Sequence, residues 1–228
     1  MSTNKDSPVF NIIGVSRLRM TNDGDGVTTL VAGHGCPLRC RYCLNPQCFE
    51  RPDPIRSYTV PELLEEVRID DLYFQATGGG IVFGGGEPLL YPDFIHEFKA
   101  ACPPEWKIGL ESSLNVPLSS LKKVISDIDF YIIDIKDMNP EIYRAYSGIG
   151  NEQVIRNLEY LITVAGPDKV CIRIPLISSF NTEEDRLRSE EQLREMGFTT
   201  FDKFRYNVER SESKRGKDAC SQEKAPTE

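Results

Sequence analysis

The chain has 228 residues, of which 39% are hydrophobic and 27% charged, a composition typical of one ordinary globular domain. The chain has 27 lysine and arginine residues but 35 aspartate and glutamate residues, and the resulting net charge of −8 argues against a nucleic-acid partner. The sequence shows no apolar run near the roughly 20 residues of a membrane span and no secretory signal at its polar start. We therefore expect a cytoplasmic protein without a membrane partner.

Apolar runs typical of strands alternate with amphipathic segments typical of helices along most of the chain. The expected strands are 27–32, 80–83, 107–110, 130–135, 170–176 and 201–206, with 10–18 as a candidate extra edge strand. The expected helices are 60–67, 92–101, 118–125, 139–146, 152–165 and 183–196. Thr59 and Glu62 form a capping-box pattern at the start of the first helix.

Six such units are too few for a closed eight-unit barrel of about 250 residues. They predict an α/β fold in which an open six-stranded parallel sheet with outer helices curls into a partial (β/α)6 barrel. A doubly wound open sheet is the alternative, and both place a ligand at the carboxyl ends of the strands. We expect one domain over residues 1–208, and the polar, charged segment 209–228 predicts a disordered tail.

The cysteines are unevenly distributed, because four of the seven lie between positions 36 and 48. Directly after the first expected strand, Cys36, Cys40 and Cys43 have C-x3-C-x2-C spacing. Three thiolates on one loop can hold three irons of a [4Fe-4S] cluster and leave the fourth iron open to a substrate. A zinc site completed by Cys48 or His34 is the alternative, since zinc also binds thiolate and imidazole.

The motif has Tyr42 before its last cysteine, and Gly85, Gly86 and Glu87 follow at the end of the second strand. This combination resembles the radical S-adenosylmethionine superfamily, and within it the glycyl-radical enzyme activases such as pyruvate formate-lyase activating enzyme. The likeness extends over residues 21–206. No second set of closely spaced cysteines follows the first, so one cluster is expected.

The resemblance implies that Cys36, Cys40 and Cys43 bind the cluster and that the open iron holds the amino and carboxylate groups of S-adenosylmethionine (SAM). An electron from the cluster would cleave SAM to methionine and a 5′-deoxyadenosyl radical, which removes a hydrogen atom from the substrate. The open iron implies oxygen sensitivity, so anaerobic handling is expected.

Further roles are implied by the same resemblance. Lys136 would join the three cysteines as a catalytic residue close to SAM, and Glu87 would face the methionine ammonium. Glu111, Ser112 and Asp134 would surround a possible monovalent cation. Together the implied cofactor-binding residues are Tyr42, Gly85, Gly86, Glu87, Glu111, Ser112, Asp134, Lys136, Arg173 and Asn207. A structural ion pair is the alternative for Arg173, because a charge inside an apolar strand must be paired or face a cavity.

The leading hypothesis is an oxidoreductase that takes a hydrogen atom from a backbone glycine of a partner glycyl-radical enzyme, with flavodoxin or ferredoxin as the electron donor. A second hypothesis is a radical enzyme that acts on a small molecule or a peptide side chain and is similar to the carboxy-deazaguanine synthases. Departures from the activase pattern at Thr28, Leu44 and Asn207 motivate it. A non-catalytic zinc-binding module is the third hypothesis.

Overall fold

The computed structural model describes residues 7–20, 23–51 and 54–206. An eight-stranded sheet with strand order β3-β1-β2-β4-β5-β6-β7-β8 forms its centre. The strands are β1 (Val9–Arg19), β2 (Thr28–Gly33), β3 (Ser57–Thr59), β4 (Gly80–Gly85), β5 (Lys107–Ser112), β6 (Phe130–Asp134), β7 (Val170–Leu176) and β8 (Thr200–Arg205). The six strands β2, β4, β5, β6, β7 and β8 pair in parallel, each with the next. At the other side of β2, β1 pairs antiparallel with β2, and β3 pairs antiparallel with β1 at the edge of the sheet.

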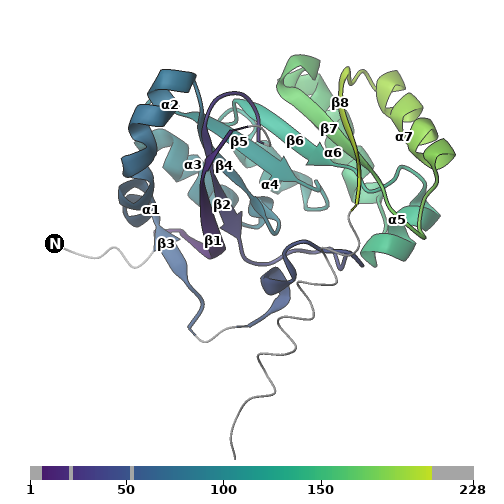
Figure 1. The fold of residues 1–228 in the computed structure, drawn as a ribbon, viewed down its shortest axis with the longest axis horizontal. Helices are drawn as coiled ribbons and strands as arrows, with labels where there is room; N and C mark the ends of the chain where they lie inside the picture. The colour runs from purple at the N-terminus through teal and green to yellow at the C-terminus, as the bar shows by residue number, and fades with distance from the viewer. Residues whose placement is uncertain (1–6, 21–22, 52–53, 207–228) are drawn as a thin grey trace, which may run out of the picture.

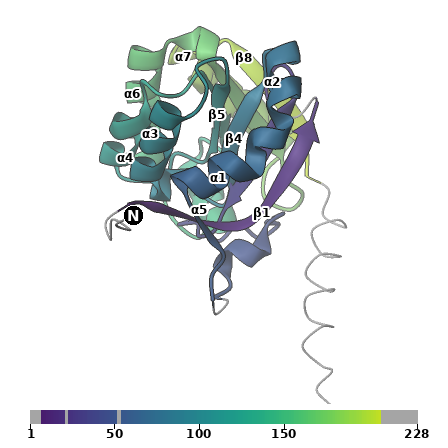
Figure 2. The ribbon, with the colours of Figure 1, turned by 90° about the vertical axis from the view of Figure 1, so that its left-hand side faces the viewer.

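The α-helices of the described residues lie outside the curled sheet, as Figures 1 and 2 show. They are α1 (Val60–Val67), α2 (Asp71–Thr77), α3 (Pro92–Ala101), α4 (Leu118–Val124), α5 (Pro140–Ser147), α6 (Glu152–Ala165) and α7 (Glu183–Glu195). The capping box at Thr59 and Glu62 is present at the start of α1. In α5, the Asn139 side chain accepts hydrogen bonds from the first turn, so the helix begins one residue later than expected.

The main core lies between the strands and the helices. Alternate strand residues belong to it, as expected where successive side chains point to opposite faces: Ile81 and Phe83 in β4, Ile108 and Leu110 in β5, Tyr131 and Ile133 in β6, and Ile172 and Ile174 in β7. Helix residues such as Leu63, Phe94 and Leu158 complete it. Because one face of the sheet packs against the helices, the expected partial barrel is confirmed over the doubly wound alternative.

The register aligns charged residues on the inner face of the sheet. Asp134 in β6 pairs with Arg173 in β7, and Arg173 pairs with Asp202 in β8. At the other end of the parallel series, Gly33 in β2 pairs with Gly85 in β4. The chain segments that follow these strands therefore meet at one end of the barrel.

Two expectations fall outside the described residues. They are Asn207 as a cofactor-binding residue and the tail over 209–228. None of the helices in the described part of the chain is both long and apolar enough to cross a membrane.

Candidate active site

A cavity of about 530 Å³ lies at the carboxyl ends of the parallel strands. This volume falls within the range of small-molecule sites. Ten of the residues singled out from the sequence line it: Cys36, Cys40, Cys43, Gly85, Gly86, Glu111, Ser112, Asp134, Lys136 and Arg173. The fold thus gathers residues that are more than 130 positions apart in the sequence.

The cysteine loop after β2 is fixed by contacts with the end of α5. The backbone N–H of Arg39 donates to the carbonyl of Ser147 at 2.7 Å, and that of Arg41 donates to Tyr146 at 3.1 Å. The Arg39 guanidinium also donates to the carbonyl of Cys36 at 2.7 Å. These bonds hold the loop backbone in place while the three thiols face the cavity.

Burial changes the acidity of the loop thiols. It raises the pKa of Cys36 to about 12, with a further contribution from the charge of Glu87, and raises the pKa of Cys40 to about 11. Without a metal these thiols are protonated at neutral pH, so metal binding must displace their protons.

The donor set fits an iron–sulfur cluster. Three thiols line one cavity, and thiolates are the usual ligands of such clusters. Across the described residues, no three His, Cys, Asp or Glu side chains converge on a point that could hold one metal ion. A cluster needs a different arrangement, because each thiolate binds an iron of its own.

The glycine-rich turn after β4 is hydrogen-bonded to the start of the cysteine loop. Gly86 N donates to the carbonyl of Gly33 at 3.0 Å, and Glu87 N donates to that of Gly35 at 2.8 Å. A Cβ atom at position 86 would lie only 2.3 Å from the Gly35 carbonyl oxygen. The turn therefore requires glycine there because two backbone segments meet.

Glu87 is completely buried and is not one of the residues that line the cavity. Its carboxylate accepts hydrogen bonds at 2.7 Å from the hydroxyls of Ser112 and Ser113, and at 3.0 Å from Ser113 N. Burial raises the pKa of Glu87, although the serine hydrogen bonds favour its charged form. In this structure the carboxylate joins the end of β5 to the glycine-rich turn.

Asp134 and Lys136 form an ion pair in the cavity wall. Lys136 Nζ also donates to the Tyr206 hydroxyl at 3.4 Å. Burial opposes the ammonium charge, but Asp134 and other neighbouring groups hold the pKa of Lys136 well above its usual value. The second carboxylate oxygen of Asp134, Oδ1, is buried and has no hydrogen-bond partner within the described part of the chain.

Arg173 is both paired and exposed to the cavity. Its Nη1 donates to Glu111 Oε1 at 2.7 Å, its Nε donates to Asp202 Oδ2 at 3.3 Å, and its Nη2 lies 4.0 Å from Asp23 Oδ1. The structural ion pair considered from the sequence is therefore present. Because Arg173 also lines the cavity, its pairing does not exclude a contact with a ligand.

Tyr42 does not line the cavity. Its ring packs in an aromatic cluster instead. Its ring centroid is 6.3 Å from that of Tyr146 and 5.9 Å from that of Phe180. Conversely, Asn45, Phe204 and Tyr206 line the cavity without having been selected from the sequence. The position of Phe204 and Tyr206 at the last expected strand end was the available signal for these two residues.

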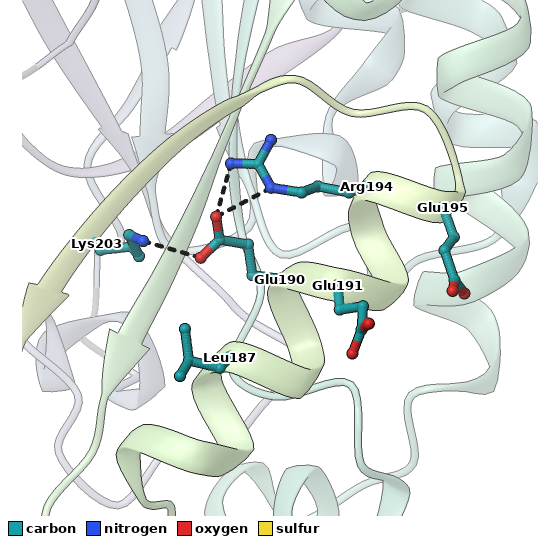
Figure 3. Close-up of a pocket in the computed structure, with 6 residues that line it drawn as sticks. All are labelled: Leu187, Glu190, Glu191, Arg194, Glu195 and Lys203. Carbon is teal, nitrogen blue, oxygen red and sulfur yellow. Dashed lines mark hydrogen bonds and ion pairs between the residues drawn. The ribbon is translucent and has the colours of Figure 1, made fainter.

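A second hollow lies between α7 and the edge strand β8, away from the cysteines (Figure 3). There, Glu190 accepts hydrogen bonds from Arg194 at 2.7 Å and from Lys203 at 2.9 Å. These charges pair with one another across the helix and the strand, so we regard the hollow as structural.

The comparisons with known proteins agree with this geometry. Residues 30–200 match the family described as the radical SAM superfamily, and the chain belongs to that superfamily. It is 29% identical to the (2S)-3-sulfopropanediol dehydratase activating enzyme of Klebsiella oxytoca, over 80% of this chain and 76% of the relative. It is 27% identical to the pyruvate formate-lyase-activating enzyme of Clostridium pasteurianum, over 73% of this chain and 68% of the relative.

Among solved structures, SuiB of Streptococcus suis bound to S-adenosylmethionine superposes with a TM-score of 0.61 and 14% identity, over 85% of this chain and 47% of SuiB. At this identity the match shows a shared fold alone. Membership of the superfamily implies an iron–sulfur cluster and SAM, and it confirms the resemblance inferred from the cysteine and glycine motifs. The zinc-module hypothesis loses its basis, because the family match includes most of the chain.

Proposed function

We propose that this chain is a glycyl-radical enzyme activase, an oxidoreductase that removes a hydrogen atom from a backbone glycine of a partner enzyme. The observation that carries the proposal is that one cavity contains the three motif cysteines together with the Asp134 and Lys136 pair. The relatives from Klebsiella oxytoca and Clostridium pasteurianum, both named as activating enzymes, support the glycyl-radical assignment.

Cys36, Cys40 and Cys43 would hold one [4Fe-4S] cluster, since they line the cavity and supply its usual ligands. When bound, the cluster and SAM together supply the reductive cleavage that generates a radical. Assembly requires the protein to release the protons of its buried thiols. The Arg39 and Arg41 backbone bonds keep the loop in one conformation while this happens.

The other cavity residues would bind and orient SAM, a zwitterion with an additional sulfonium charge. Lys136 and Arg173 supply fixed positive charge, and Glu111 and Asp134 supply negative charge. Backbone groups of Gly85 and Gly86 border the same space, where the absence of side chains permits close approach. Opposite charges in a partly dry cavity interact more strongly than in water, so this pattern favours one orientation of the ligand.

A monovalent cation near Glu111, Ser112 and Asp134 is part of the proposal. Its support is the buried Asp134 Oδ1, which lacks a hydrogen-bond partner among the described residues. The other two expected ligands are engaged, since Glu111 accepts from Arg173 and Ser112 donates to Glu87. Reduced flavodoxin or ferredoxin as electron donor and a cytoplasmic location remain predictions from the sequence.

The proposal is tested by anaerobic reconstitution with iron and sulfide, reduction with dithionite and addition of SAM. We expect 5′-deoxyadenosine from the native protein and none from a Cys40→Ala control. With a candidate glycyl-radical enzyme present, a glycine-centred doublet should appear in the electron paramagnetic resonance (EPR) spectrum. Cleavage of SAM without that doublet for any candidate partner would count against the activase role.

A second candidate is a radical enzyme that acts on a small molecule or a peptide side chain. Leu44, one of the departures from the activase pattern, lines the cavity and supports this alternative. Transfer of deuterium from a labelled small substrate into 5′-deoxyadenosine would favour it. No such transfer is expected if the hydrogen donor is a glycine in a protein.

A further inference from the structure

Tyr206 connects the end of the edge strand β8 to Lys136, which follows β6. The Tyr206 hydroxyl accepts a hydrogen bond from Lys136 Nζ at 3.4 Å, although the two residues are 70 positions apart in the sequence. Both residues line the cavity. Tyr206 is only 9% exposed, and the side chain of Lys136 is only 7% exposed. The contact is therefore a buried part of the cavity wall.

The ring of Tyr206 is held in place independently of Lys136. Its backbone N–H donates to the carbonyl of Leu176 at 3.0 Å. Its ring centroid lies 6.1 Å from that of Tyr146 and 5.6 Å from that of Phe204. These contacts use the backbone and the ring, so they do not depend on the hydroxyl. The hydroxyl is thus a fixed attachment point for the side chain of Lys136.

The ammonium group of Lys136 meets the hydroxyl of Tyr206 rather than the face of its ring. Nζ lies 3.4 Å from the hydroxyl oxygen but 5.7 Å from the ring centroid. A cation gains most from an aromatic ring when it lies over the ring face. Because Nζ lies at the hydroxyl end of the ring, we assign the contact to the hydroxyl oxygen.

This contact is one of two that locate the ammonium group. An ammonium has three N–H donors, and within the part of the chain that the structure describes, Lys136 donates to Asp134 Oδ2 and to the Tyr206 hydroxyl. A lysine has a long, flexible side chain, so two partners on different strands define the position of its charge better than one. One N–H donor is left for an acceptor in the cavity, and a carboxylate is the strongest acceptor for a charged donor.

We propose that Tyr206 is a positioning residue that fixes the Lys136 ammonium so that its remaining N–H donates to the carboxylate of bound SAM. This inference rests on the proposed function, which places SAM in the cavity. Tyr206 acts through Lys136, so the loss of its hydroxyl weakens SAM binding only while the lysine and the ligand carboxylate are both present. Such a coupling is what a double-mutant cycle measures.

The test measures SAM binding to each reconstituted, oxidised holoenzyme by anaerobic equilibrium dialysis with radiolabelled SAM and without a reductant. Tyr206→Phe keeps the ring and backbone contacts, and we expect it to bind SAM about fivefold more weakly, the effect of one hydrogen bond. Tyr131→Phe is the matched control, because it removes a buried hydroxyl that donates to the carbonyl of Ile125 at 2.9 Å in the main core. It should bind SAM with native affinity.

A second ligand tests the role of the carboxylate. Decarboxylated SAM differs from SAM in lacking that group, so Tyr206→Phe and the native protein should bind it equally. Native affinity of Tyr206→Phe for SAM would overturn the inference. An equal loss of affinity for SAM and for decarboxylated SAM would overturn it too, because a general distortion of the cavity weakens both ligands.

Lys136→Met separates this inference from the proposed function. Native SAM affinity in Lys136→Met would refute the placement of Lys136 beside SAM. If Lys136→Met binds SAM weakly, adding Tyr206→Phe should cause no further loss, and an independent fivefold loss in the double variant would refute the role of Tyr206 alone. If Lys136→Met does not fold, the comparison of the two ligands decides, since it needs no substitution at position 136.

Discussion

Arg173 connects the inner face of the sheet to the cavity through several carboxylates. Its closest contact is with Glu111 at 2.7 Å, and its side chain is 16% exposed. Burial raises the pKa of Glu111, and the positive charge of Arg173 opposes that effect. Arg173 therefore favours the ionised form of Glu111, which burial disfavours.

We predict that Arg173→Met lowers the free energy of unfolding by about 2 kcal/mol at pH 7, less than a fully buried pair because solvent reaches both groups. Without the arginine, the raised pKa of Glu111 rises further, and protonation at lower pH removes the unpaired charge. The difference in the free energy of unfolding between Arg173→Met and the native protein should therefore become smaller as the pH falls from 7 to 5. Urea denaturation at both pH values measures it.

Arg173→Lys is the matched control for that prediction. It retains a positive charge and should lose less stability than the methionine variant, although it cannot form the same set of hydrogen bonds. A deficit in Arg173→Met that is equal at pH 7 and pH 5 would show that lost packing, rather than the charge of Glu111, causes it.

Several site residues could be located from the sequence because their position depends on strand ends. Asp134 and Lys136 follow a clear apolar run, and parallel strands bring their carboxyl ends to one side of a sheet. The hydrogen bonds from Ser112 and Ser113 to Glu87 could not be predicted. Those contacts depend on how loops fold over one another, and no period in the sequence encodes that.

At the scale of elements, the turn after β4 and the cysteine loop act as one unit. A Cβ at position 86 would approach the carbonyl oxygens of Gly35 and Gly33 to 2.3 Å and 2.6 Å. We predict that Gly86→Ala pushes the loop away, lowers the iron content of the reconstituted protein and costs about 2 kcal/mol of stability. Iron analysis and thermal denaturation measure the two effects.

Gly14→Ala in β1 is the control, because a Cβ there meets no atom within 4 Å. It should leave the iron content unchanged and alter stability by less than about 1 kcal/mol. Full iron content in Gly86→Ala would mean that the loop tolerates displacement and that the close packing is not needed to form the site.

The contact between α7 and β8 depends on the carboxylate of Glu190 (Figure 3). Hydrogen bonds from Lys203 and Arg194 lower the pKa of Glu190. The stabilisation is therefore fully present above the usual glutamate pKa of about 4.3 and is lost as pH falls through the lower folded value. We predict that Glu190→Gln loses about 1 kcal/mol at pH 7 and that this difference vanishes at strongly acidic pH.

Urea midpoints at pH 7, 5 and 3.5 test the prediction, with Glu191→Gln as the control. Glu191 is exposed on the same helix, so its substitution should change little. An equal loss of stability in the two variants would indicate a general effect of charge on α7 instead of a specific contact with β8.

The long elements could be predicted because their apolar periodicity is strong. The expected bounds of α1, α3, α6 and β7 match the structure. In contrast, α2 was not expected, because Phe74 is its only buried residue and it shows no apolar period, and β3 spans only three residues. β4 and β5 extend past their expected ends because their last residues, Gly85 and Ser112, carry little apolar signal while still pairing with neighbouring strands.

At the scale of the whole molecule, the core and the cluster site are largely separate. The main core extends from Phe10 in β1 to Phe198 before β8, and the motif cysteines Cys36 and Cys40 only pack against its border. A hydrophobic core of this size stabilises a domain without help from a metal. The situation differs from a small zinc domain, in which metal binding supplies the folding free energy.

We therefore predict that chelation of the cluster leaves the far-ultraviolet circular dichroism and a cooperative urea transition intact. The cluster binds the folded state only, so the reconstituted protein should unfold at a higher urea concentration than the stripped protein. Stripped native protein and Cys40→Ala should have similar midpoints, because both lack the cluster but retain the core. Loss of cooperative unfolding on stripping would instead show that the cysteine loop organises the sheet from β2 onward, which the packing of the core argues against.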